Sequence, residues 1–301
     1  MAFRTLEITK PSEIHVKESQ LLITQEENTF SIPLEDLNHI ICMGPNIRLS
    51  TMAISKITSF KIILVILDEK YMPSVSILPF EGHTRQALIL KKQILISEEK
   101  KQALWHQIIK MKITNQQRVL AMIGRDGIEE IDNLIQKLNI NNVDETEALA
   151  ARIYFYNIYT DFNRRVDHPL NSKLNYGYAT IRCAIIKSLA ASGFNIALGL
   201  HHDSQLNSFN LADDLIEPYR AMVDYLALQN VSNSIKLSKI ERKEMASVLF
   251  NACLINKTKY SVLKAIDIMI ESLKRIIVDN SKECLLLPQV YPSEMLSGII
   301  E

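Results

Sequence analysis

Residues 197–224 hold the group of side chains best suited to chemistry. The imidazole and carboxyl groups between residues 201 and 217 of this stretch are His201, His202, Asp203, Asp213, Asp214 and Glu217. Helical spacing places the last three roughly on one side, where like charges repel unless a cation compensates them. Carboxylates with imidazole, and without thiolates, favour Mg²⁺ or Mn²⁺ over zinc. A solvated acidic helix face beside surface histidines is the alternative, and spacing alone leaves both open.

A second stretch, residues 144–155, places a carboxylate in an interior setting. Glu147 is followed by several alanines, and small residues allow helices to pack closely. A carboxylate buried at such a contact requires a partner, because burying a lone charge is costly. Arg152 is the neighbouring candidate, so a structural ion pair is the alternative to a catalytic role. No periodicity joins Glu147 to the acidic cluster of residues 197–224.

The pattern of expected strands and helices, which must position these groups, predicts an α+β fold. A small N-terminal β-rich domain over residues 1–80 precedes a large all-α domain over residues 81–301. The expected strands lie within 12–24, 29–34, 37–43 and 62–67, and the expected short helix is 50–59, capped by Ser50. Proline and glycine at 79–84 mark the change to helical spacing. The expected helices are 84–123, 127–138, 145–162, 171–192, 211–228 with a kink at Pro218, 238–255 and 259–277.

Charge is balanced over the whole chain but not locally. The 301 residues contain 34 Lys plus Arg and 34 Asp plus Glu, which excludes a strongly basic nucleic-acid coat. Eight basic residues face only two acidic ones between residues 85 and 118: Arg85, Lys91, Lys92, Lys100, Lys101, Lys110, Lys112 and Arg118, against Glu98 and Glu99. This segment is either a surface that follows a phosphate backbone or a solvated helix face.

Several classes of protein are disfavoured by composition. Only eight glycines are present, which argues against a glycine-rich nucleotide-binding loop. The longest aliphatic run, residues 62–67, is far below the roughly 20 residues that span a bilayer, and no signal peptide is visible. The four cysteines form no C-x-x-C pair, so reduced thiols and a cytoplasmic location without membrane association are expected.

Four motifs in a fixed order give the chain a family resemblance. They are residues 147–155 (EALAARIYF), 171–178 (NSKLNYGY), 199–202 (GLHH) and 214–220 (DLIEPYR). In these motifs the sequence resembles the CRISPR-associated endonuclease/integrase of spacer acquisition, and the resemblance extends over the whole chain. The compact length, the paired histidines and residues 208–210 resemble the versions of type II systems most.

The resemblance implies a set of site residues. The positions that match the family's metal ligands, which are also its catalytic residues, are Glu147, His202 and Glu217, with Mg²⁺ or Mn²⁺ as the cofactor. His202 matches better than His201, and Asp214 matches a supporting acidic position. Many relatives have glycine where this chain has Ala148, which changes packing rather than the ligand set. The helical domain then becomes the catalytic domain.

The resemblance also implies a reaction and partners. The expected enzyme is a metal-dependent DNA endonuclease/integrase that joins the 3′-OH ends of short duplex foreign DNA, the protospacers, into a CRISPR repeat by transesterification. Expected partners are double-stranded DNA, a second copy contacted through residues 1–80, a small ferredoxin-like partner dimer in a heterohexamer, and further type II adaptation proteins. A catalytically silent DNA-binding assembly subunit and a structure-specific nuclease for branched DNA are the alternatives.

Overall fold

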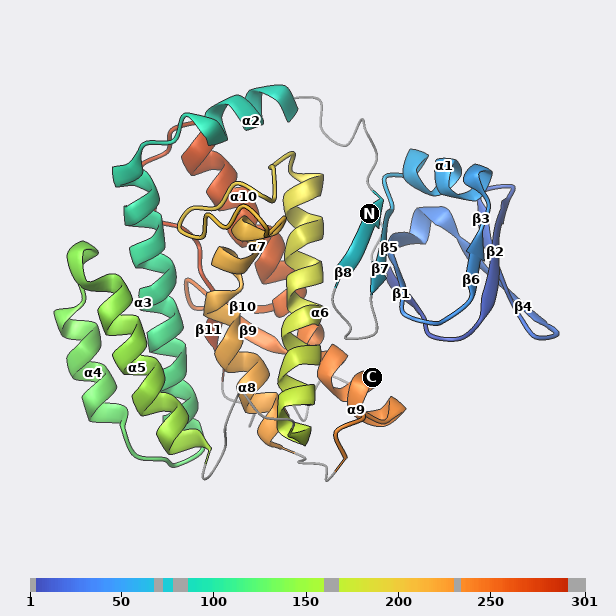
Figure 1. The fold of residues 1–301 in the computed structure, drawn as a ribbon. Helices are drawn as coiled ribbons and strands as arrows, with labels where there is room; N and C mark the ends of the chain where they lie inside the picture. Colours follow the sequence, from blue (N-terminus) through green and yellow to red (C-terminus); the bar gives the residue numbers. More distant parts are fainter. Residues whose placement is uncertain (1–3, 68–72, 78–85, 160–167, 230–233, 292–301) are drawn as a thin grey trace. The chain divides into compact units, whose positions relative to one another are not determined.

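The computed structural model describes residues 4–67, 73–77, 86–159, 168–229 and 234–291 (Figure 1). Contacts divide the chain into two compact units, residues 1–84 and 85–301. The boundary predicted at 79–84 lies outside the described residues. The order of the units is β-rich and then mainly helical, so the predicted α+β class is confirmed.

The described residues of the N-terminal unit form two four-stranded sheets, one α-helix and a short 3₁₀ turn, Leu34–Asp36. One sheet has the order β1-β5-β7-β8 and the other the order β4-β3-β2-β6. The strands are β1 Arg4–Ile8, β2 Ser12–Lys17, β3 Gln20–Gln25, β4 Asn28–Pro33, β5 Leu37–Cys42, β6 Ile47–Leu49, β7 Ile63–Leu67 and β8 Pro73–Ile77. Helix α1, Thr51–Ser59, begins where the Ser50 hydroxyl accepts the Ala53 N–H at 3.1 Å, as predicted. Alternate apolar side chains such as Ile14, Leu21 and Ile40 form the core of this unit.

The helical unit is organised around α3, Glu98–Met122, the longest described helix. The others are α2 Gln86–Ile94, α4 Ile128–Lys137, α5 Val143–Ile158, α6 Pro169–Ala191, α7 Asn210–Leu215, α8 Arg220–Leu228, α9 Lys239–Ala246 and α10 Val262–Val278. Helix α3 contacts α4 and α5, and it also contacts α8 and the 3₁₀ turn Glu217–Tyr219, which lies between α7 and α8 (Figure 1). No helix within the described ranges is long and apolar enough to cross a membrane.

The predicted helices differ from the structure at two places in the chain. The stretch 84–123 is broken after Ile94, and Ser97 caps a new helix by accepting the Lys100 N–H. The predicted helices 238–255 and 259–277 are wrong where they approach each other, because β9 Ala252–Ile255 and β10 Thr258–Ser261 form a hairpin there. Strand β11, Gln289–Val290, completes this small sheet, so the domain predicted to be all-α also contains a three-stranded sheet.

The hairpin has a local physical cause. Asn256 and Lys257 adopt positive φ angles of 47° and 67°, which a tight turn allows and a helix does not. Burial alternates along β9, with Cys253 and Ile255 buried, so its period is two rather than 3.6. A four-residue apolar stretch is too short for periodicity to distinguish a strand from a helix.

Gly177 allows the close packing of α6 against α8 and α9. A Cβ atom at this position would lie 2.5 Å from Val223 Cγ1 and 2.8 Å from Met245 Cε. We expect Gly177→Ala to lower the free energy of unfolding by about 1–3 kcal/mol, because the added methyl group overpacks the core. The higher helix propensity of alanine offsets only part of this loss. Urea denaturation measures this change. An unchanged or higher urea midpoint would mean that the side chains of Val223 and Met245 shift to accommodate the methyl group without loss of stability.

Candidate active site

Glu147 and Glu217, the acidic pair, meet at one lysine. Lys112 of α3 places its Nζ in an ion pair with Glu147 Oε1 of α5 and at 2.5 Å from Glu217 Oε2. Lys112 is 8% exposed and Glu217 is 5% exposed, so the contact lies in the interior. The cation beside Glu147 is therefore Lys112 and not its sequence neighbour Arg152.

Glu217 is an ionised carboxylate despite its burial. Burial raises the pKa of Glu217, but the positive charges of Arg220 and Lys112 outweigh it, so the pKa lies below the usual 4.5. Arg220 Nε donates to Glu217 Oε1 at 2.7 Å, and its guanidinium lies 4.9 Å from the centre of the Tyr178 ring. Glu217 Oε2 is buried and has the ion contact with Lys112, but it accepts no hydrogen bond of regular geometry.

The turn that carries Glu217 is held from two sides. Pro218 ends the regular helix, as the sequence predicted, and a 3₁₀ turn follows α7. Asn115 of α3 is completely buried, and its Nδ2 donates to the Pro218 carbonyl at 2.7 Å and to the Pro288 carbonyl at 2.9 Å. Its Oδ1 accepts the Val290 N–H at 3.0 Å. Asn115 thus fixes the position of the Glu217 turn relative to α3. No sequence pattern indicated this role.

Asp214 orients His202. Its carboxylate is completely buried and accepts the backbone N–H groups of Leu200 at 2.5 Å and of His201 and His202 at 3.1 Å each. Asp214 Oδ1 also lies 2.6 Å from His202 Nδ1. This hydrogen bond is the main reason that the pKa of His202 lies above 6.5, while partial burial opposes the shift. The imidazole is half-exposed, and its Nε2 is the ring nitrogen that remains for a ligand.

The loop of residues 199–202 wraps tightly around this carboxylate. A Cβ at Gly199 would lie 2.2 Å from the His202 carbonyl oxygen and 2.8 Å from Asp214 Oδ2, so only glycine fits. The buried Asn210 side chain donates to the carbonyls of Ala197 and Ser204, both at 3.0 Å, and so ties the two sides of the loop together.

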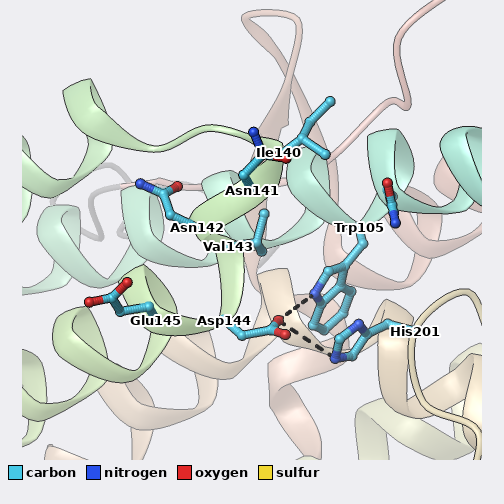
Figure 2. Close-up of a pocket in the computed structure, with 9 residues that line it drawn as sticks. Trp105, Ile140, Asn141, Asn142, Val143, Asp144, Glu145 and His201 are labelled. Carbon is cyan, nitrogen blue, oxygen red and sulfur yellow. Dashed lines mark hydrogen bonds and ion pairs between the residues drawn. The ribbon is translucent and has the colours of Figure 1, made fainter.

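His201 has a different role from His202. Its ring stacks on Trp105 with centroids 4.2 Å apart and planes at 4°, whereas His202 meets Trp105 edge-on at 5.8 Å. Figure 2 shows Asp144 beside the edges of the two stacked rings, with Trp105 Nε1 donating to Asp144 Oδ1 at 3.2 Å and His201 Nε2 3.7 Å from the same oxygen. The pocket in Figure 2 has a volume of about 610 Å³, which includes the space where it opens to solvent. The geometry favours His202 as the candidate ligand.

The other acidic candidates do not join the site. Asp213 pairs with Arg182 at 2.6 Å and accepts from Asn207 at 2.7 Å, which is a structural network. Asp203 is exposed on the loop surface.

The types of donor group suit a divalent ion, but the two carboxylates share a lysine. Within the part of the chain that the structure describes, no group of three or more His, Cys, Asp or Glu side chains is arranged to hold a metal ion as it stands. The acidic pair nevertheless converges on a cation, the Lys112 ammonium, and leaves a buried carboxylate oxygen without a regular hydrogen bond. An imidazole whose Nδ1 contacts a carboxylate is the usual form of a metal-binding histidine. The side-chain chemistry of Glu147, Glu217 and His202 therefore suits a divalent ion, although among the described residues Lys112 and not a metal joins the two carboxylates.

A second pocket opens beside Glu217. Its volume is about 550 Å³ with its open mouth, and its lining includes Lys112, Gln116, Tyr178, Arg220 and Asp224. Asp224 is buried and accepts the hydroxyl groups of Tyr178 and, at 3.1 Å, Tyr154. Two cationic side chains thus line a cavity next to the acidic pair.

The basic segment is not one continuous charged face. Lys112 is buried, Lys100 donates to the Ile276 carbonyl at 2.6 Å, and Lys101 pairs with Glu98 at 2.8 Å. The exposed members among its described residues are Lys91, Lys92 and Lys110. Arg85 lies outside the described residues. A DNA surface on this segment would therefore depend on fewer charges than the sequence suggests.

The same two-unit fold occurs in solved proteins. A casposase bound to its integration product matches with a TM-score of 0.77 and 19% identity, over 94% of this chain and 92% of that one. A chain of a Cas6-RT-Cas1–Cas2 complex matches with a TM-score of 0.76 and 17% identity, over 96% of this chain and 36% of that one.

Residues 6–266 match the family model for CRISPR associated protein Cas1. The CRISPR-associated endonuclease Cas1 of Neisseria meningitidis serogroup C (strain 8013) is 32% identical over 297 residues, which cover 97% of this chain and 98% of that protein. The chain belongs to the Cas1 family. The family expected from the four motifs is therefore confirmed.

Proposed function

We propose that this chain is a metal-dependent DNA endonuclease/integrase of CRISPR adaptation. It joins the 3′-OH ends of short duplex foreign DNA to a CRISPR repeat by transesterification. The observation that carries the proposal is the meeting of Glu147 from α5 and Glu217 from the turn between α7 and α8 on one buried cation. Family membership supports it, since the Neisseria relative is an endonuclease and the matching casposase was solved with an integration product.

Glu147, His202 and Glu217 would hold Mg²⁺ or Mn²⁺. The bound ion would polarise the target phosphate and stabilise the charge that develops as the 3′-oxygen attacks. Asp214 contributes by holding Nδ1 of His202 and fixing the ring so that Nε2 is the ligand atom. Arg220 keeps Glu217 ionised and in place through its 2.7 Å contact. One phosphodiester replaces another, so no nucleotide hydrolysis is needed.

The proposed partners are DNA, a second copy of the chain and a small ferredoxin-like dimer. The Cas6-RT-Cas1–Cas2 complex, one chain of which has the same fold, supports Cas2 as that small partner. A homodimer would use the N-terminal unit. DNA affinity would depend on salt, because phosphate contacts release counterions.

Strand transfer on a repeat-bearing plasmid tests this function. The protein and its small partner are mixed with a labelled duplex carrying free 3′-OH ends and with Mg²⁺ or Mn²⁺. His202→Ala is compared with His15→Ala, a matched change at an exposed histidine of β2. Label should reach the repeat borders with wild type and His15→Ala, and not with His202→Ala.

Other outcomes would point to the two alternatives. Cutting of branched DNA without any transfer to the repeat would support a structure-specific nuclease. DNA binding that neither requires metal nor leads to any strand transfer would support a silent assembly subunit.

A further inference from the structure

Lys112 is a buried cation between two carboxylates that the proposed reaction requires. Its Nζ contacts Glu147 Oε1 and Glu217 Oε2, and its side chain is 10% exposed. The acidic pair thus shares one ammonium group, which occupies the position between them where a divalent ion would neutralise the same charges.

The charge of the cluster is already balanced without a metal. Glu147 and Glu217 carry two negative charges, and Lys112 and Arg220 carry two positive charges. Adding a divalent ion while Lys112 stays in place would leave surplus positive charge in a buried site, because the neighbouring Asp224 carboxylate offsets only one of the two added charges. Removing Lys112 without adding a metal would instead leave two neighbouring carboxylates facing each other.

The lysine has room to move. A lysine side chain is a flexible four-carbon stem that carries a point charge. Lys112 lines the pocket of about 550 Å³ beside Glu217, so its ammonium can turn away from the carboxylates toward solvent or a bound phosphate. Arg220 lacks this freedom, because its guanidinium both pairs with Glu217 and lies over the Tyr178 ring.

We infer that Lys112 is a positioning residue that exchanges with the divalent ion. In the metal-free protein its ammonium holds Glu147 and Glu217 together, and it releases both carboxylates when the ion binds. The inference rests on the proposed function, since it assumes a divalent ion at this site. It assigns Lys112 to the site and removes it from the basic surface segment.

Thermal unfolding with and without Mn²⁺ tests the exchange. Lys112→Met is compared with Lys110→Met, an exposed position two residues away on α3. In chelator, Lys112→Met should lower Tm by about 5–10 °C, because two carboxylates lose their cation. Mn²⁺ should restore most of this loss and so raise Tm more than in wild type. Lys110→Met should behave as wild type in both conditions.

Mn²⁺ affinity is a second readout that does not depend on activity. Trp105 is the single tryptophan of the chain and lies 5.8 Å from the His202 ring, so paramagnetic Mn²⁺ at the site should quench its fluorescence. Without a competing ammonium, Lys112→Met should bind Mn²⁺ at least about tenfold more tightly. Equal or weaker binding than wild type would overturn the inference. Absence of Mn²⁺ binding by wild type would instead overturn the proposed metal site, and the inference with it.

A double variant covers the case in which Lys112→Met does not fold. Lys112→Met with Glu147→Gln removes one of the two facing carboxylates, so the metal-free Tm should recover toward that of Glu147→Gln alone. If the double variant fails to fold as Lys112→Met does, Lys112 acts by packing and the inference is wrong.

Discussion

Glu217→Gln is expected to reduce strand transfer by on the order of 10³-fold at saturating metal. Loss of an ionised ligand removes about 4 kcal/mol of the stabilisation that a metal gives to the reacting phosphate. The amide keeps the shape of the side chain and can still accept from Arg220, and Lys112 keeps Glu147 as a partner. The fold should therefore persist, with an unchanged circular dichroism spectrum. Quantitative strand transfer over a range of Mn²⁺ concentrations measures the effect.

Glu130→Gln is the matched control for this change. Glu130 is an exposed carboxylate in the first turn of α4, so its replacement should leave strand transfer unchanged. If Glu217→Gln retained strand transfer, Glu217 would be only the buried partner of Lys112 and Arg220, and the site assignment would be wrong.

Asp214→Asn is expected to reduce strand transfer by about 10- to 100-fold without removing a metal ligand. Asp214 accepts three backbone N–H groups and contacts His202 Nδ1, so an amide NH₂ would face donors. The loop of residues 199–202 should loosen, and the stacking of His201 on Trp105 should loosen with it. A changed emission of Trp105 together with weaker Mn²⁺ binding would identify this positioning role. Unchanged Mn²⁺ affinity would contradict it.

The same variant should change the titration of His202. In wild type the hydrogen bond with Asp214 raises the pKa of His202 above 6.5. The stability that this contact contributes is therefore complete below the unfolded value of 6.5 and is lost as pH rises through the raised pKa of the folded state. In Asp214→Asn the pKa of His202 should fall, and NMR titration of the imidazole in metal-free protein measures it. A pKa that stayed raised would mean that other charges maintain it.

Local patterns predicted much of the fold because they follow from short-range preferences. The Ser50 cap, the strands around it and the kink at Pro218 depend on caps, alternation and backbone geometry within a few residues. The hairpin of β9 and β10 was missed because its apolar stretch is too short for periodicity to distinguish a strand from a helix, and β9 also pairs with β11, which lies about 35 residues later in the chain.

The sequence by itself determined the family and the candidate ligands. Four motifs in order led to Glu147, His202 and Glu217, and the spacing of Asp214 and Glu217 placed both on one helical stretch. These are properties of residue type and order, so they can be read without coordinates.

Only the tertiary structure decided which cation the carboxylates share and what holds each of the two histidines in place. Lys112 looked like one more surface lysine of a basic helix, but packing of α3 against α5 and the Glu217 turn buries it between two carboxylates. His201 and His202 are adjacent in sequence, yet one stacks on Trp105 and the other is held by Asp214. A buried charge has to find its partner in space rather than along the chain.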